Sequence, residues 1–199
     1  MVSKGLSKEK IVNEAIKIIE KNGKPDICLH EISRQLGIKT PSLYNHIKNT
    51  DELENSIFKY AIDLLVNQLE LAIKNKEKDE AIKAFANQYI EFAIQNKGLY
   101  LLIMSIPKSK NSEAKQIALP LLNLVIDILK PYNLNKEYMV RYQRILRALL
   151  HGFIAEIYLD YFYYYSEINI KDSITLALEN FAKEINLHSS IKENSHATK

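Results

Sequence analysis

One stretch decides the fold of this chain: Glu31-Ile32-Ser33-Arg34-Gln35-Leu36-Gly37-Ile38-Lys39-Thr40-Pro41-Ser42-Leu43-Tyr44-Asn45-His46. Ile32 and Leu36 are four residues apart, so they share one face of a short helix. Gly37 supplies the left-handed backbone that ends a helix at little cost. Thr40 is a good N-cap and Pro41 a good first residue for a second helix. The stretch therefore predicts two short helices joined by a tight turn.

The second short helix of this pair has a polar outward face. Leu43 points back toward the core, and the outward side chains are small or polar, with one phenol: Lys39, Thr40, Ser42, Tyr44, Asn45 and His46. Such a face on a short helix suits the major groove of DNA, where hydrogen bonds read the bases. The alternative for this stretch alone is an ordinary corner between two helices.

Length and composition favour an all-α protein. The 199 residues include only five Gly and five Pro, which leaves long uninterrupted segments, and no segment alternates apolar and polar residues as a strand would. The single cysteine, Cys28, rules out an intramolecular disulfide and fits a reducing cytosol. No secretory segment opens the chain, and no apolar run reaches the roughly 18 residues of a membrane span. We expect a cytoplasmic protein of about nine helices.

Caps and breaks in the hydrophobic pattern predict the helix boundaries. Ser7, Thr50 and Asn135 are the expected N-caps of three helices, and Gly23 ends the first of them. After the three-helix unit of residues 6–48, we expect helices at about 50–74, 79–96, 99–105, 113–130 (kinked by Pro120 or starting near it), 135–164 and 170–187.

Positive charge is concentrated at the amino-terminal end. Residues 1–50 hold nine Lys and Arg against five Asp and Glu, a balance of +4, whereas the whole chain carries +3, so residues 51–199 sum to −1. A basic end on a nearly neutral body is a modest indication of a phosphate-bearing partner. The alternative is a solvated Lys-rich surface, because the chain uses Lys heavily throughout.

The amino-terminal part resembles the DNA-binding domain of TetR/AcrR-type transcriptional repressors. The most specific segment is Leu-Gly-Ile-x-x-x-Ser-Leu-Tyr-x-His at residues 36–46, supported by Ile11, Ala15, Gly23, Ile32, Ile47 and Leu53. Residues 149–153, Leu-Leu-His-Gly-Phe, are also similar to one branch of these repressors, whose C-terminal domain carries a tryptophan-histidine-glycine signature. Here Leu150 stands in place of the tryptophan.

The resemblance implies four parts of the chain. These are a helix-turn-helix DNA-binding domain at 1–50, a connecting helix at 51–76, an effector-binding and dimerisation domain at 77–188, and a disordered tail at 189–199. It also implies double-stranded operator DNA, a second copy of the chain and a small-molecule effector as partners. No cofactor is expected.

The resemblance places the second short helix in the major groove. The residues that it implies for DNA binding are His30, Lys39, Thr40, Pro41, Ser42, Tyr44, Asn45, His46, Lys48 and Thr50. Ser42 and Asn45 can read bases, while Tyr44 and His46 mostly contact phosphate in this family; for His46 the alternative is a cap at the end of the helix. The family usually has Lys where Thr50 stands, so we expect a shallower salt dependence unless Lys48 supplies that charge.

The body of the chain is expected to enclose an effector pocket, again by resemblance. Its candidate lining residues are Tyr89, Phe92, Tyr100, Met104, Tyr142 and His151. Polar-tipped aromatics and a methionine suit a moderately apolar ligand. Plain core is the better interpretation for each of these residues taken singly.

A cluster of aromatic residues near Tyr161–Tyr165 is more than a monomer can bury, which favours a partner surface. The resemblance implies a symmetric dimer through the last two helices, which would present two recognition helices to two half-sites. An enzyme is not expected, because the five histidines lack metal-ligand spacing and no Gly-rich phosphate loop or paired nucleophile and base occurs. The alternatives are a small-molecule-binding module and a protein-interaction module without specific DNA binding.

Overall fold

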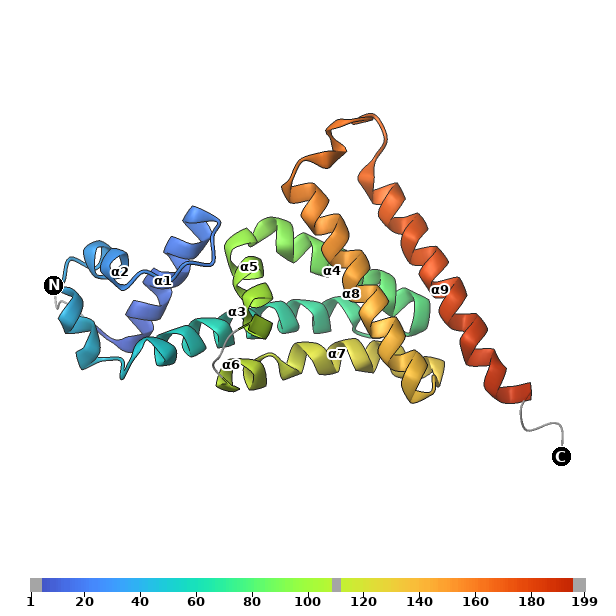
Figure 1. Cartoon of the computed structure of the whole chain (residues 1–199), viewed down its shortest axis with the longest axis horizontal. Coiled ribbons are helices and arrows are strands. Elements are labelled where there is room, and N and C mark those ends of the chain that lie inside the picture. Colours follow the sequence, from blue (N-terminus) through green and yellow to red (C-terminus); the bar gives the residue numbers. More distant parts are fainter. Residues whose placement is uncertain (1–4, 109–111, 195–199) are drawn as a thin grey trace. The chain divides into compact units, whose positions relative to one another are not determined.

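The computed structural model describes residues 5–108 and 112–194, and in those ranges it contains helices and no strand (Figure 1). The α-helices are α1 (Lys8–Asn22), α2 (Leu29–Gln35), α3 (Thr50–Ile73), α4 (Lys78–Gln95), α5 (Lys97–Ser105), α6 (Ser112–Ile117), α7 (Leu119–Leu129), α8 (Lys136–Tyr158) and α9 (Ile170–Asn194). Four 3₁₀-helices join them: η1 (Thr40–Asn45), η2 (Ile106–Lys108), η3 (Lys130–Tyr132) and η4 (Tyr161–Tyr163). The predicted all-α fold is confirmed. Within the described ranges, no helix is both long and apolar enough to cross a bilayer.

The chain forms two compact units, which share the long helices α3 and α4. Unit 1 takes the chain up to Leu65 together with Phe92–Leu121, and unit 2 takes Val66–Glu91 together with the chain from Leu122 onward. The domain boundaries expected near residues 50 and 76 remain predictions.

In unit 1, α1 is built as its sequence predicts. The side-chain Oγ of Ser7 accepts the N–H of Lys10 at 3.3 Å, and Gly23 ends the helix in the left-handed region at φ 60°. The apolar face is fully buried at Ile11 and Ile19. This face is what holds α1 in the core, since burial of an aliphatic side chain is worth roughly 1.5–3 kcal/mol.

Helix α5 begins against the carboxyl-terminal half of α1, also within unit 1. A Cβ added to Gly98 would lie 2.3 Å from the carbonyl oxygen of Ile19, so the two backbones approach too closely for any other residue. The carboxylate of Glu20 accepts the N–H of Leu99 at 2.7 Å and satisfies one of the open donors at the start of α5.

Unit 2 is organised around α8 and α9, which run side by side (Figure 1). Tyr142 of α8 is buried, and its hydroxyl lies 3.0 Å from the carbonyl oxygen of Glu184 and 2.6 Å from Nδ1 of His188 on α9. A second polar contact joins the start of α4 to η3, where the hydroxyl of Tyr132 donates to Asp79 Oδ1 at 2.6 Å.

Several helix boundaries differ from the predicted ones for local reasons. Thr50 is the first residue of α3, and the cap is Asn49, whose Oδ1 accepts the N–H of Glu52 at 2.8 Å. Helix α8 ends at Tyr158 rather than near 164, because Asp160 is left-handed at φ 57°. Pro120 is the second residue of α7, a position where its missing N–H costs nothing.

Helix α9 continues to Asn194, past the expected end near residue 187. Residues 189–194 of the expected tail are therefore helical, and residues 195–199 lie outside the described ranges. Asn135 does cap α8, since its Oδ1 accepts the N–H of Tyr138 at 2.9 Å.

Candidate nucleic-acid interface

A glycine turn sets the angle between α2 and η1. Gly37 has φ 69°, a conformation that residues with a Cβ rarely adopt. The N–H groups of Leu36 and Ile38 donate to the carbonyl oxygens of Ile32 and Ser33, each at 3.0 Å, and close the turn. The predicted helix-turn-helix geometry therefore has a specific backbone cause.

The second element is a 3₁₀-helix, and Thr40 is not its cap. The N-cap is Lys39, and the N–H of Ser42 donates to the Lys39 carbonyl at 2.8 Å, an i to i+3 bond. Thr40 Oγ1 instead lies 2.8 Å from the Oγ of Ser33. Pro41 is the second helical residue rather than the first.

The hydroxyl of Ser33 fixes the direction of the Thr40 hydroxyl. Ser33 is buried, and its Oγ–H donates to the carbonyl oxygen of His30 at 2.9 Å. A serine hydroxyl has one proton, so Thr40 must donate to Ser33 in this arrangement. Thr40 then keeps only acceptor capacity, which is unsuited to a phosphate unless the Ser33 bond breaks.

The remaining polar residues of this segment face solvent. Leu43 is fully buried and Tyr44 is 50% exposed, so η1 has one inward and one outward side. The exposed members of the predicted DNA-binding set are His30, Lys39, Pro41, Tyr44, Asn45, His46 and Lys48. Thr40, Ser42 and Thr50 are half-buried. These residues thus lie on an accessible face, and their contacts with DNA remain a prediction.

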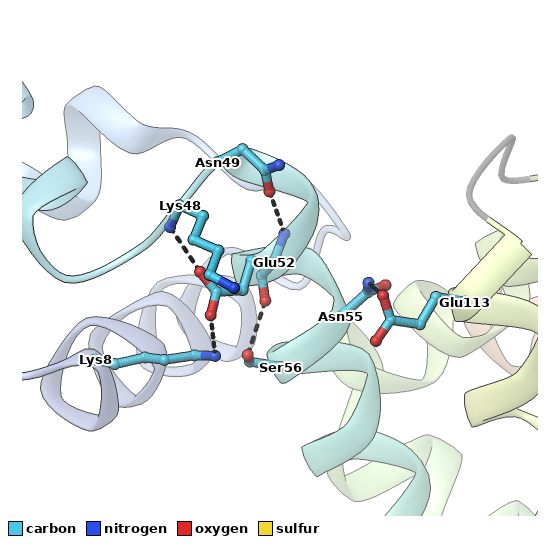
Figure 2. Close-up of polar contacts among 7 residues, drawn as sticks. All are labelled: Lys8, Lys48, Asn49, Glu52, Asn55, Ser56 and Glu113. Atoms are coloured by element: carbon cyan, nitrogen blue, oxygen red, sulfur yellow. Dashed lines mark hydrogen bonds and ion pairs between the residues drawn. The ribbon is translucent and has the colours of Figure 1, made fainter.

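The start of α3 carries a polar cluster that the sequence reasoning only partly anticipated (Figure 2). Glu52 accepts the backbone N–H of Lys48 at 2.6 Å through Oε2, and Lys8 Nζ lies 2.8 Å from its Oε1. The spacing Asn49-x-x-Glu52 is a capping-box signal that can be read from sequence. The Lys8 contact joins residues 44 positions apart and left no such signal.

This cluster lines an open hollow of about 550 Å³. On its far side, the side-chain amide of Asn55 donates to Glu113 of α6 at 2.7 Å (Figure 2). Asn55 is buried, so the contact satisfies a polar group that would otherwise be costly in the core. All of these residues belong to unit 1.

The predicted effector residues do not fall in one unit. Phe92, Tyr100 and Met104 belong to unit 1, and Tyr89, Tyr142 and His151 to unit 2. The four aromatic residues of the set are buried, while Met104 and His151 are half-buried. Burial raises the pKa of Tyr100 to about 12.

His151 of unit 2 is half-buried beside an aromatic neighbour. Its ring lies edge-on to that of Tyr89 at 5.8 Å between centroids, and burial, followed by the charge of Arg147, lowers its pKa below the usual value. Gly152 is exposed, and among the described residues nothing lies within 4 Å of a Cβ added there, so no helix packs closely against this glycine in that part of the chain.

Two further hollows among the described residues are lined by residues other than the predicted effector set. One of about 130 Å³ lies beside Ile73, and one of about 510 Å³ lies beside Arg141 and Arg144 at the start of α8. Arg141 pairs with Glu137 and lies over the ring of Tyr138, so it forms part of a solvated face. Among the residues described, no group of three His, Cys, Asp or Glu side chains could hold a metal ion.

Known proteins match both the sequence and the fold. Residues 82–179 match the family described as "Tetracyclin repressor-like, C-terminal domain". The chain is 28% identical over 179 residues to "Uncharacterized HTH-type transcriptional regulator YobS" of Bacillus subtilis, which covers 89% of this chain and 91% of YobS. In sequence, the chain is therefore similar to a tetracyclin repressor-like C-terminal domain and to a helix-turn-helix type regulator.

Further matches concern part of the sequence and the fold. The chain is 28% identical over 116 residues to the biofilm operon icaADBC negative transcriptional regulator IcaR of Staphylococcus epidermidis, covering 54% of this chain and 59% of IcaR. Its fold is that of SCO7222, a TetR from Streptomyces coelicolor, with TM-score 0.67, 12% identity and coverage of 92% of this chain and 100% of that one. It also matches S. coelicolor ActR in complex with (S)-DNPA, with TM-score 0.63, 16% identity and coverage of 90% and 96%.

Proposed function

We propose that this chain is a dimeric transcriptional repressor that binds a palindromic operator and is released from it by a small-molecule effector. The observation that carries the proposal is the polar, solvent-facing side of η1, held on a glycine turn next to α2. Tyr44, Asn45 and His46 are exposed there while Leu43 anchors the segment. A short segment of this kind can enter the major groove and present hydrogen-bonding groups to base edges.

The chemistry of the side chains on this face suggests which of them contact bases and which contact phosphates. The Asn45 amide can pair with an adenine through two hydrogen bonds, which gives sequence preference. The Tyr44 hydroxyl and the His46 ring suit phosphate oxygens, which give register and affinity without sequence information. Replacing Tyr44 by Phe should therefore weaken binding to all duplexes alike.

A dimer is proposed from the exposed faces of α8 and α9. Residues of α8 spaced alternately by three and four are small or apolar and exposed: Ile145, Ala148, Gly152 and Ala155. On α9, Leu176 and Leu187 are 60% and 63% exposed, and their spacing of 11 places them on one face. Two copies packed through these faces would bury apolar surface and would carry two recognition segments, as a palindromic site requires.

Repression and effector release are proposed from the relatives. IcaR is named a negative regulator and ActR was solved in complex with (S)-DNPA, so negative regulation and small-molecule binding both occur among similar proteins. An effector would act by binding better to a conformation that does not fit the operator. The tryptophan-histidine-glycine branch stays a prediction that rests on Leu150, His151 and Gly152 alone.

The test is selection from a random duplex library by the purified protein, followed by binding isotherms at two salt concentrations. We expect one enriched palindrome whose complex weakens as salt rises. No enriched sequence would refute the proposal and favour a ligand-binding or protein-interaction module. A thermal-shift screen of small molecules then identifies the effector, which must both stabilise the protein and lower its operator affinity.

A further inference from the structure

The carboxylate of Glu52 lies at the amino-terminal end of α3. Glu52 lies in the first turn of a 24-residue helix, and its two carboxylate oxygens accept from the Lys48 backbone N–H at 2.6 Å and from Lys8 Nζ at 2.8 Å. Lys8 and Glu52 are 42% and 28% exposed at their side chains, so the pair is accessible from solvent. Figure 2 shows the carboxylate between these two donors.

Glu52 is ionised at neutral pH. Its pKa is lowered first by the Lys48 N–H bond and then by the Lys8 hydrogen bond, and the charges of Lys8 and Lys48 act in the same direction. A third lysine that borders the hollow, Lys59, pairs with Asp63 at 3.0 Å. Lys8 and Lys59 are therefore each paired with a carboxylate of the chain.

A DNA phosphate would need the same donors that Glu52 uses. A helix amino-terminus and nearby ammonium groups are favourable for any anion, whether carboxylate or phosphate. A phosphate that approached α3 would have to displace Glu52 or bind against its negative charge. Displacement of Glu52 would break an ion pair and a backbone hydrogen bond that the free protein makes.

We propose that Glu52 is an internal competitor of DNA phosphate that lowers the affinity of this regulator for non-specific duplex. The inference rests on the proposed function and adds a specificity-determining residue to it. Because non-specific binding comes almost entirely from phosphate contacts, a carboxylate that blocks one contact weakens it more than operator binding, to which base contacts also contribute. The ratio of operator affinity to non-specific affinity therefore rises.

The experiment compares Glu52→Gln with Glu14→Gln in the full chain on random-sequence duplex and on the selected operator. Glu14 also pairs with a lysine, Lys17 at 3.2 Å, so both variants remove one paired carboxylate and change the net charge equally. Glutamine can still accept the Lys48 N–H, which preserves the cap. We expect Glu52→Gln to raise non-specific affinity about threefold to tenfold above Glu14→Gln and to steepen the salt slope by about one phosphate contact.

Asn49→Ala separates competition from capping. Asn49 supplies the other half of the cap, through the Glu52 N–H, and its loss lowers stability but leaves the Glu52 charge in place. It should give no gain in non-specific affinity. Thermal unfolding verifies that Glu52→Gln and Asn49→Ala are folded under the conditions of the binding assay.

Equal non-specific affinity and equal salt slope for Glu52→Gln and Glu14→Gln would overturn the inference and leave Glu52 a structural cap. In that case the wild-type chain still selects a palindrome, so the proposed function survives. A wild-type chain that binds no duplex at either salt concentration would overturn both.

Discussion

At the scale of single residues, the protein uses carboxylates to close helix ends across long sequence distances. Glu20 accepts the Leu99 N–H at the start of α5. Burial raises the pKa of Glu20, and the Leu99 hydrogen bond, which acts in the opposite direction, is the smaller effect. Burial therefore destabilises the ionised carboxylate more than the Leu99 hydrogen bond stabilises it.

Replacing Glu20 by Gln tests that balance. An acid whose folded pKa is raised stabilises the fold below its ordinary pKa, and this contribution is lost as pH rises through the folded pKa. At pH 7 the ionised Glu20 is thus unfavourable, while a glutamine keeps the acceptor without the charge. We expect Glu20→Gln to raise the melting temperature at pH 7 and to lose that advantage near pH 4, measured by thermal unfolding across this range.

The exposed residue Glu70 provides the control for this prediction, because Glu70→Gln removes the same charge from the surface. Its effect on the melting temperature should be small, because the side chain is exposed. A Glu20→Gln variant that melts lower than wild type at pH 7 would mean that the Leu99 hydrogen bond needs the full negative charge.

Single residues also mark where sequence reasoning succeeded and where it could not. Gly37 and Leu43 were predictable because backbone geometry and hydrophobic spacing are local. The bond between Thr40 and Ser33 was not, because a threonine before a proline reads as an N-cap until the neighbouring helix is in place. The same applies to Lys8, whose partner lies 44 residues away.

At the scale of elements, local capping signals predicted some helix boundaries and missed others. Ser7 and Asn135 cap their helices as predicted, since an N-cap needs only its own side chain and the next turn. The end of α8 was missed because the aromatic residues that follow Tyr158 continue an apolar pattern. The helix stops at a left-handed backbone at Asp160, and an aspartate does not predict that conformation as a glycine would.

The packing of α5 on α1 gives a prediction of its own. Gly98→Ala places a Cβ 2.3 Å from the Ile19 carbonyl oxygen, which is backbone and cannot rotate away. Helix propensity favours alanine by about 1 kcal/mol, but overpacking costs about 1–3 kcal/mol or more, so we expect a net loss of stability. Chemical denaturation of Gly98→Ala measures it.

Gly5→Ala is the matched change at a site where nothing lies within 4 Å of the added Cβ. It should leave the denaturation midpoint nearly unchanged. A Gly98→Ala variant as stable as Gly5→Ala would show that α5 can move off α1 at no cost, and the contact would then not be a rigid junction.

At the scale of the whole molecule, binding to a palindromic operator requires two copies of the chain. The stripe on α8 that includes Ala148 is exposed in a single chain, so a substitution there should not disturb the monomer fold. Ala148→Glu would bury an unpaired carboxylate from each copy in the proposed interface, at a cost of several kcal/mol. We expect wild type to sediment as a dimer and Ala148→Glu as a folded monomer with weak operator binding.

Asn123→Glu adds the same charge to an exposed position of α7 and should remain dimeric. Sedimentation of wild type as a monomer at micromolar concentration would contradict the proposed dimer. An Ala148→Glu variant that remains dimeric would place the interface elsewhere. The exposed aromatic residues of the α8–α9 connection, Tyr163 at 71% and Tyr164 at 75%, are the alternative surface.

If the outward side of η1 reads DNA bases through Asn45, duplex-library selection with Asn45→Ala will reveal it. We expect the variant still to select a palindrome, but one base position in each half-site should lose its preference, by about 1–3 kcal/mol of discrimination. An Asn45→Ala selection identical to that of wild type at every position would contradict it.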